Sequence, residues 1–338
     1  MKYAKFLNKE DLIGVCALSE GFSLDNYYKL DLATSNIKKI GYNVIISDIA
    51  KNNIKGRSAD KITRSNNFFD MYKNDKIKCL INAKGGSFLF ECLPYIKFDE
   101  ICNLTPKWVQ GYSDTTTILF TLTTICDIAT IYSENFSGLA LNNIHKSFVN
   151  NFDILSGKNI TQNSFEYYEE NDIDDTTLNL NEHNLTSKVC VKSLFNEKQI
   201  NIKGRLIGGC LDVLLNIVGT RFDNVNNFLE KYKSDGFIWY LESYNIDTAS
   251  ITIALLQLKE AGWFKYIKGI VFGRPYVSDI EYNISYKEAL YDALKDFNIP
   301  VIYDADIGHK FPQFTLINGS IANIKYIDNK ISIVQELI

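Results

Sequence analysis

Ser113 is the residue of this chain whose setting most favours nucleophilic chemistry. It lies in segment 110–116, which reads QGYSDTT, between the apolar pair Trp108-Val109 and the start of an amphipathic helical pattern. A strand that enters a helix through a tight turn can expose a serine hydroxyl as a nucleophile. The positive end of the helix also stabilises a developing oxyanion. The alternative interpretation of Ser113 is a helix N-cap without chemistry.

Glu242 and His309 could make this hydroxyl reactive. Glu242 ends the apolar run 237–241, FIWYL, where a charge needs a partner or a function. His309 follows another apolar run, in the segment 306–309, DIGH. A carboxylate that orients a histidine base beside a serine makes a neutral hydroxyl nucleophilic. The order Ser, Glu, His is that of α/β hydrolases, although Thr115 stands where the hydrolase elbow has glycine.

Other interpretations of these residues remain open. Glu242 could be a structural partner of Arg205 or Arg274, and His309 could be a loop residue that caps the preceding strand. Asp304 and Asp306 with His309 could hold a divalent metal for metal-assisted hydrolysis. The chain could also be a non-catalytic protein with two lobes that close on a small ligand. We expect no metal, because no other His or Cys converges on these residues by spacing, and no nicotinamide cofactor, since no G-x-G-x-x-G follows the first predicted strand.

The first part of the chain alternates strand and helix patterns. Strands are predicted at 12–17, 44–46, 78–82 and 108–110, and helices at 25–40, 58–72 and from residue 88. This alternation predicts an α/β fold with a doubly wound, mostly parallel sheet. In such sheets functional groups gather beyond the carboxyl ends of the strands, where Gly85-Gly86 and Ser113 fall.

The second part is predicted to be a β-rich α/β domain. A polar stretch without clear periodicity leads into it, so we expect an N-terminal domain at 1–150, a linker at 151–185 and a C-terminal domain at 186–338. Segments 188–192 and 200–204 alternate like a hairpin, and Gly208-Gly209 precedes a helical run, so Gly209 is a weak candidate for lining the site. Further strands are expected at 237–241, 267–272 and 300–303, with a hairpin at 322–334.

Composition excludes several classes of protein. The chain has 338 residues, of which 46% are hydrophobic and 22% charged, with a net charge of −4. It has no basic stripe, which argues against nucleic acid or an anionic membrane as a partner. Seven scattered cysteines without a C-x-x-C pair predict reduced, buried thiols rather than disulfides or a zinc site. No segment resembles a signal peptide, and we expect a cytoplasmic protein.

Three blocks of the sequence resemble the signatures of the LD-carboxypeptidase family of serine peptidases. They are the segments 111–116 (GYSDTT), 241–242 (LE) and 308–309 (GH), and the resemblance runs from the first strand to Asn318-Gly319. That family includes cytoplasmic muramoyl-tetrapeptide carboxypeptidases and microcin C immunity peptidases. The resemblance implies a parallel-sheet domain, a β-rich domain and a homodimer. The substrate it implies is a murein tetrapeptide or an aminoacyl-nucleotide conjugate.

By this resemblance Ser113 is the nucleophile, His309 the general base and Glu242 the residue that orients it. The backbone N–H groups of Gly86 and Asp114 would form the oxyanion hole, and Gly85 and Lys84 would line the substrate site. The family often has arginine before the Gly-Gly pair and tyrosine after it, whereas this chain has Lys84 and Ser87. The DIGH segment and the long separations between the three blocks resemble the microcin-immunity branch.

Overall fold

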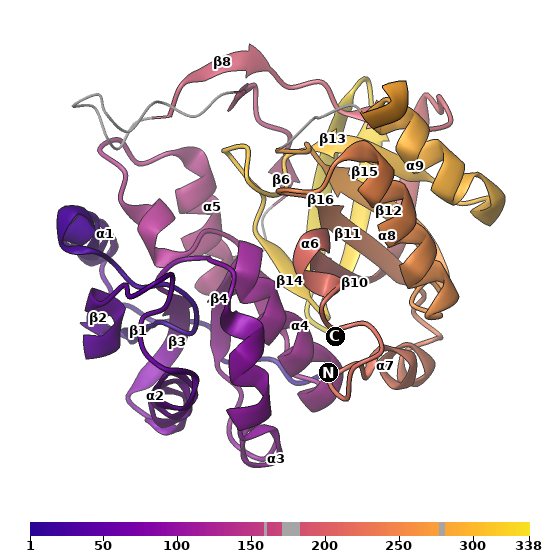
Figure 1. Cartoon of the computed structure of the whole chain (residues 1–338). Helices are drawn as coiled ribbons and strands as arrows, with labels where there is room; N and C mark the ends of the chain where they lie inside the picture. Colours follow the sequence, from indigo (N-terminus) through magenta and orange to yellow (C-terminus); the bar gives the residue numbers. More distant parts are fainter. Residues whose placement is uncertain (159–160, 171–182, 277–280) are drawn as a thin grey trace. The chain divides into compact units, whose positions relative to one another are not determined.

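The computed structural model contains two compact units and describes residues 1–158, 161–170, 183–276 and 281–338 (Figure 1). Of these residues, the first unit contains 1–158 and Thr315–Asn318, and the second contains 161–170, His183–Phe314 and Gly319–Ile338. The division into domains at 1–150 and 186–338 with a linker between them stays a prediction. Much of the expected linker, 171–182, lies outside the described residues.

The sheet of the first unit confirms the predicted doubly wound fold. Its strand order is β14-β5-β4-β3-β1-β2, and all neighbours are parallel except β14 with β5. The strands are β1 (Leu12–Cys16), β2 (Asn43–Ile46), β3 (Ile77–Asn82), β4 (Trp108–Gly111), β5 (Thr130–Tyr132) and β14 (Leu316–Asn318). The order reverses between β1 and β3, because β2 lies on one side of β1 and β3 on the other. A crevice at such a reversal is the usual ligand-binding position.

Helices connect these strands as the sequence pattern predicts. They are α1 (Tyr27–Lys39), α2 (Lys61–Lys73), α3 (Phe98–Ile101), α4 (Thr116–Cys126) and α5 (Lys146–Leu155). Short 3₁₀ helices lie at Leu24–Asn26, Asp48–Lys51, Leu89–Tyr95, Ser113–Thr115 and Phe136–Leu139. One expectation was wrong: α4 is not amphipathic, because ten of its eleven residues are buried and Ile125 alone is half-buried. The helix after Ser113 therefore lies inside the unit and is firmly held.

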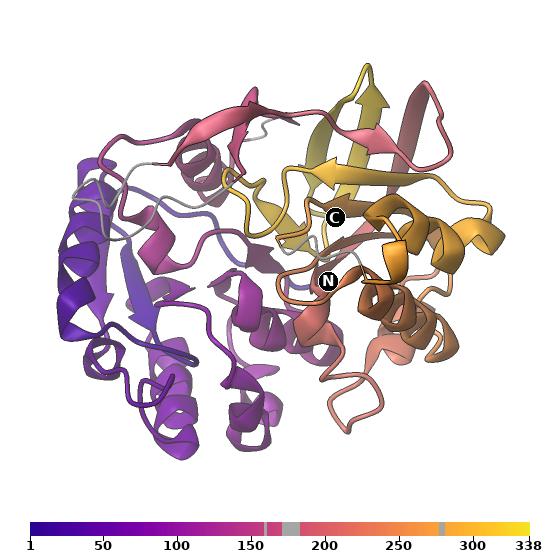
Figure 2. The same cartoon turned by 45° about the horizontal axis from the view of Figure 1, so that its top comes forward.

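The second unit contains a mixed sheet with the order β6-β16-β15-β10-β11-β12-β13-β9. Its centre, β10 to β13, is parallel, and the pairs toward both edges are antiparallel. The strands are β6 (Gln162–Asn163), β9 (Lys192–Ser193), β10 (Gln199–Cys210), β11 (Phe237–Glu242), β12 (Ile267–Gly273), β13 (Val301–Ala305), β15 (Ile321–Ile327) and β16 (Lys330–Glu336). Figure 2 shows β15 and β16 as neighbouring yellow arrows, which confirms the hairpin expected at 322–334.

The remaining elements of the second unit are short. A two-stranded ribbon joins β7 (Tyr167–Glu169) to β8 (Leu185–Lys188). The helices are α6 (Leu211–Leu214), α7 (Val225–Lys231), α8 (Thr248–Glu260) and α9 (Tyr286–Leu294), with 3₁₀ turns at Glu281–Asn283 and Lys295–Phe297.

The hairpin expected between 188–192 and 200–204 was wrong. β10 pairs with β11 on one side and with β15 on the other, while β9 pairs with β13. Alternating polar and apolar residues specify a strand but not its partner, because pairing depends on contacts distant in sequence. Gly208 and Gly209 likewise belong to the long strand β10 and not to a turn before a helix.

The cysteine prediction was wrong for one pair. Cys102, at the end of α3, and Cys126, at the end of α4, form a disulfide with a Cα–Cα distance of 4.8 Å. No sequence pattern indicates it, because 24 residues separate the two and only the packing of α3 against α4 brings them together. Among the other five cysteines, four thiols are buried and that of Cys190 is exposed.

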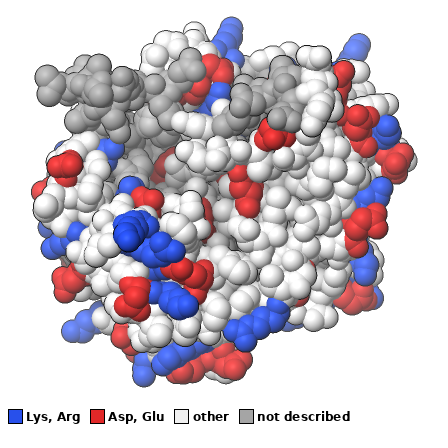
Figure 3. Space-filling view, viewed as in Figure 1, with Lys and Arg blue, Asp and Glu red and all other residues white. Residues whose placement is uncertain are grey.

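The surface carries both signs of charge. On the face seen in Figure 3, acidic and basic side chains are interspersed outside the grey region. Within the described part of the chain, no helix is long and apolar enough to cross a membrane.

Candidate active site

Ser113 lies at the carboxyl end of β4 in a conformation that favours exposure of its hydroxyl. Its φ of 61° is in the left-handed region, which is rare for a residue other than glycine and clusters at functional sites. Tyr112 before it is extended, and the 3₁₀ turn and helix α4 follow at once. This is the strand-turn-helix context that a nucleophile elbow requires.

Two asparagines that the sequence analysis missed form hydrogen bonds that stabilise this turn. Asn135 Oδ1 accepts hydrogen bonds from Thr115 Oγ1 (3.0 Å) and from the Tyr112 N–H (3.3 Å). Asn82 Nδ2 donates to Thr115 Oγ1 (2.8 Å) and to the Lys84 carbonyl (2.7 Å). Thr115 thereby links the turn after β4 to those after β3 and β5. The available signal was that both asparagines end or follow an apolar strand at the same edge of the sheet.

Asp114 is buried, and its carboxylate fixes the loop that contains Gly86. Asp114 Oδ2 accepts hydrogen bonds from Ser19 Oγ (2.5 Å) and from the Leu89 N–H (2.9 Å). Burial raises the pKa of Asp114, and the hydrogen bonds from Ser19 and the backbone oppose that rise. Gly86 has a φ of +145°, and a Cβ there would lie 2.4 Å from Ser19 Oγ, so no larger residue fits. The Asp114 side chain therefore stabilises the loop, apart from any role of the Asp114 backbone N–H.

Gly85 and Lys84 lie on the loop after β3. A Cβ on Gly85 would meet Ser113 Cβ at 3.1 Å and Oγ at 3.2 Å, so the loop passes directly beside the candidate nucleophile. The Lys84 ammonium pairs with the Glu20 carboxylate at 3.0 Å, and both side chains are partly exposed. The structure thus brings Ser113, Gly85 and Gly86 together beyond the carboxyl ends of β3 and β4 in the first unit.

Glu242 and His309 form a hydrogen-bonded pair in the second unit. Glu242 ends β11 with 1% exposure, and its Oε2 lies 2.9 Å from Nδ1 of His309. The end of β12 and the loop after β13 approach Glu242 closely, and both have glycine at the point of contact. A Cβ on Gly308, whose φ is +96°, would lie 2.6 Å from Glu242 Oε2, and one on Gly273 would lie 3.0 Å from Glu242 Cβ. A neutral imidazole that donates Nδ1–H to this carboxylate has its acceptor at Nε2.

Cys210 and Gly209 lie on the neighbouring strand. Cys210 stands opposite Glu242 and Gly209 opposite Leu241 in the parallel register of β10 and β11. Burial, followed by the charge of Glu242, raises the pKa of the Cys210 thiol well above its ordinary value, so this thiol stays protonated. Gly209 is thus one position away from the residue that faces Glu242.

The two arginines considered as partners of Glu242 pair elsewhere. Arg205 binds Asp235 at 2.7 Å, and Arg274 binds Asp306 at 2.6 Å. Asp306 Oδ2 also accepts a hydrogen bond from the Phe165 N–H. Glu242 itself pairs with His309, which favours the orienting role over the structural-partner alternative.

The three residues considered as metal ligands each pair with a different side chain. Asp304 pairs with Lys192 at 2.8 Å, Asp306 with Arg274 and His309 with Glu242. Among the residues that the structure describes, no three His, Cys, Asp or Glu side chains are grouped so that they could hold a metal ion.

The other two histidines have structural contacts. His145 is the N-cap of α5, where its Nδ1 accepts a hydrogen bond from the Ser147 N–H at 3.1 Å. His183 Nδ1 lies 2.6 Å from Glu169 Oε2, and its ring stacks on Phe311 at 3.7 Å. Both are half-buried rather than fully exposed surface residues.

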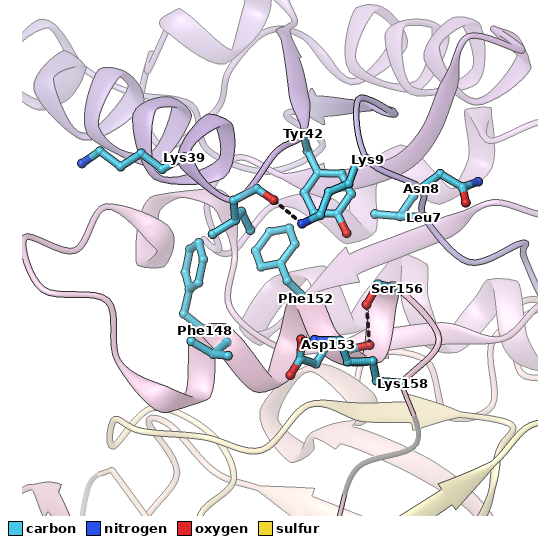
Figure 4. Close-up of a pocket in the computed structure, with 12 residues that line it drawn as sticks. Leu7, Asn8, Lys9, Lys39, Tyr42, Phe148, Phe152, Asp153, Ser156 and Lys158 are labelled. Atoms are coloured by element: carbon cyan, nitrogen blue, oxygen red, sulfur yellow. Dashed lines mark hydrogen bonds and ion pairs between the residues drawn. The ribbon is translucent and has the colours of Figure 1, made fainter.

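A cavity of about 570 Å³ lies in the first unit, at the other end of the strands from Ser113 (Figure 4). Tyr42, Phe148 and Phe152 form its aromatic wall, and Lys9 beside them donates to the Ile40 carbonyl at 2.6 Å. The residues at 7–9 precede β1, and Tyr42 precedes β2, whereas Ser113 follows β4. Because these strands are parallel, the cavity is at their amino ends, whereas Ser113 lies at their carboxyl ends.

Comparisons with known protein families identify the family of this chain. Residues 13–133 match the model of the LD-carboxypeptidase N-terminal domain, and residues 203–324 match that of the LD-carboxypeptidase C-terminal domain. The chain therefore belongs to the LD-carboxypeptidase family, a family of peptidases.

Its curated relatives are distant but cover most of the chain. A putative carboxypeptidase of Vibrio cholerae is 23% identical over 93% of this chain and 92% of its own length. The microcin C7 self-immunity protein MccF of Escherichia coli is 25% identical, covering 83% and 80%. A probable murein peptide carboxypeptidase of Bacillus subtilis is 24% identical, covering 94% and 89%.

Solved structures have the same fold. An MccF-like protein from Bacillus anthracis superposes with a TM-score of 0.84 at 22% identity, covering all of both chains. MccF in complex with aspartyl sulfamoyl adenosine superposes with a TM-score of 0.81 at 21% identity, covering 99% of this chain and 98% of the other.

Proposed function

We propose that this protein is a serine peptidase that cleaves an amide bond through Ser113, His309 and Glu242. The observation that carries the proposal is that one chain contains both a candidate nucleophile turn in the first unit and a carboxylate–histidine pair in the second unit. A serine with left-handed φ stands on a strand-turn-helix beside Gly85, and a buried carboxylate contacts the imidazole of His309 after β13. The separate match of both family domains supports it, because each domain carries one of these arrangements.

In the proposed reaction, His309 Nε2 takes the proton of Ser113 Oγ as the oxygen attacks the amide carbonyl carbon. The N–H groups of Gly86 and Asp114 stabilise the resulting oxyanion. The intermediate collapses as the C–N bond breaks, and the imidazolium gives its proton to the leaving amine. Water then attacks the acyl-enzyme ester with His309 again as base, which releases the acid and restores Ser113. Glu242 holds the tautomer and stabilises the imidazolium in both halves.

The proposed substrate is either a murein peptide or an aminoacyl-nucleotide conjugate. The first follows from the likeness to the murein peptide carboxypeptidase, and the second from the likeness to MccF and its complex with a sulfamoyl adenosine. We further propose that the protein acts in the cytoplasm as a homodimer, with Lys84 and Gly209 at the edge of the substrate site.

Product analysis after incubation with each substrate tests the proposal. The protein is incubated with muropeptides and, separately, with an aminoacyl sulfamoyl adenylate, and the products are identified by mass spectrometry. We expect cleavage of one of them, and Ser113→Ala should lower kcat by at least ~10³-fold while the circular dichroism spectrum stays unchanged. Near-full activity of Ser113→Ala would refute the proposal, and tight binding without turnover by the wild type would favour a binding protein.

A further inference from the structure

Two tyrosines pack around the imidazole of His309 in the second unit. The ring centroid of Tyr244 lies 4.4 Å from that of His309, with 33° between the planes. Tyr276 stacks on Tyr244 at 4.8 Å and meets His309 nearly edge-on at 6.0 Å. The imidazole therefore has a carboxylate on Nδ1 and the aromatic ring of Tyr244 beside its plane.

The backbone holds Tyr244 in this position independently of its ring. Asp212, on α6, accepts hydrogen bonds from the Tyr244 N–H (3.0 Å) and the Asn245 N–H (2.8 Å). The Tyr276 N–H donates to the Ser243 carbonyl at 3.1 Å, which joins the segments after β11 and β12. A change of the Tyr244 side chain alone should therefore leave the loop in place, and the 41% exposure of this residue means that little packing is lost.

We propose that Tyr244 is a positioning residue that holds the His309 imidazole and stabilises its protonated form. The face of an aromatic ring attracts a cation whose centre lies within about 6 Å, and more strongly where water is scarce. The neutral imidazole gains little from this contact, so the ring favours the state that follows proton abstraction from the nucleophile. The catalytic consequence depends on the proposed peptidase function, whereas the interaction with the imidazolium does not.

Apart from Tyr276, which stacks on Tyr244, the other titratable groups around His309 make their contacts without the Tyr244 side chain. They come from β10, β11, α6, the segment after β12 and the two loops next to His309. These groups are Glu242 on Nδ1, the protonated thiol Cys210, Asp212 under the Tyr244 backbone, the Arg274–Asp306 ion pair and the Lys310–Glu170 ion pair. Tyr244→Leu removes the ring on which Tyr276 stacks, whereas Tyr244→Phe keeps that ring, so the comparison of the two variants tests the aromatic face.

A titration of His309 by nuclear magnetic resonance tests the proposal without a substrate. The chain has only three histidines, so selective labelling and a His309→Ala spectrum assign the resonance. Tyr244→Leu keeps an apolar cover but removes the π face, and we expect it to lower the pKa of His309 by about 0.5 to 1 pH unit. Tyr244→Phe keeps the face and should leave the pKa near that of the wild type. Tyr291→Leu, at a similarly exposed tyrosine on α9, is the control.

The pH dependence of kcat/KM gives the second readout. For Tyr244→Leu, the acidic limb should move to lower pH with the titration, and kcat should fall more than KM changes; Tyr244→Phe should restore both. Equal pKa values for His309 in wild type and Tyr244→Leu, or equal behaviour of the Leu and Phe variants, would overturn the proposal. A shifted titration in a protein that cleaves nothing would refute the peptidase function and leave the tyrosine–imidazolium interaction standing.

Discussion

Replacing Glu242 by glutamine removes one charge from the candidate active site and little else. The Glu242 side chain is fully buried, and its Oε2 lies 2.9 Å from His309 Nδ1. Glutamine has the same shape and can still accept the Nδ1–H hydrogen bond through Oε1. The variant therefore loses the attraction between a carboxylate and the imidazolium that forms during the reaction, while the tautomer of His309 is kept.

The expected loss can be worked out from the contact. With charge centres about 4 Å apart and an effective dielectric constant of about 20, the attraction is about 4 kcal/mol. A transition state in which the imidazolium is largely formed loses most of that, so kcat should fall by about 10³-fold. KM should change little, since Glu242 is buried behind His309. Steady-state kinetics measures both constants, and urea unfolding checks that the fold is kept.

Glu230→Gln is the matched control, because Glu230 is an exposed carboxylate of the second unit that pairs with Lys233. It should retain full activity. If Glu242→Gln lowers kcat by less than about 10-fold, the carboxylate does not stabilise a catalytic imidazolium, and the triad is wrong in its third member.

Three further predictions concern stability. Gly308→Ala places a Cβ 2.6 Å from Glu242 Oε2 at a φ of +96°, so it should lower activity. It should also lower the free energy of unfolding by more than the ~1–2 kcal/mol that left-handed strain alone costs. Gly219→Ala has a φ of +73° and nothing within 4 Å of the Cβ, so in urea unfolding it should lose only that strain energy. Burial raises the pKa of Asp114 above its ordinary 3.8, so the native state binds this proton more tightly, and the contribution of Asp114 to stability is lost as pH rises from about 3.8 through its native pKa. Carboxylates with a lowered pKa, such as Glu91, act in the opposite direction, so the test is the difference between Asp114→Asn and the wild type. In urea titrations across that window the variant should lack the loss that Asp114 contributes, and an identical pH dependence would contradict the assignment. Cys102→Ser should lower the free energy of unfolding by about 3 kcal/mol, and dithiothreitol should then have no further effect; wild-type protein that is insensitive to the reductant would contradict a stabilising disulfide.

The sequence predicted the parts of this molecule that local patterns determine. Short apolar runs gave the parallel strands, and Ser113 and His309 were found because each follows such a run. Glu242 was found because a charge at the end of FIWYL is improbable without a partner. The carboxyl ends of parallel strands meet at one edge of a sheet, so the position of these residues followed from the fold class alone.

The parts that failed depend on contacts between distant segments. Asn82, Asn135 and Ser19 are ordinary polar residues in sequence, and their hydrogen bonds appear only when the segments after β3, β5 and β1 meet at the carboxyl edge of the sheet. Strand pairing in the second unit and the Cys102–Cys126 disulfide were missed for the same reason. Tyr244 gave no signal either, since one tyrosine among 20 is distinguished only by the imidazole beside it.

Covalent labelling of Ser113 tests the central claim most directly. A fluorophosphonate reacts with a serine hydroxyl only when a base activates it, and peptide mass spectrometry locates the adduct. The account predicts one adduct per wild-type chain, on the peptide that contains Ser113, no adduct in Ser113→Ala and strongly slowed labelling in His309→Ala. Labelling of His309→Ala at the wild-type rate, or an adduct on another residue, would contradict the activation of Ser113 by His309.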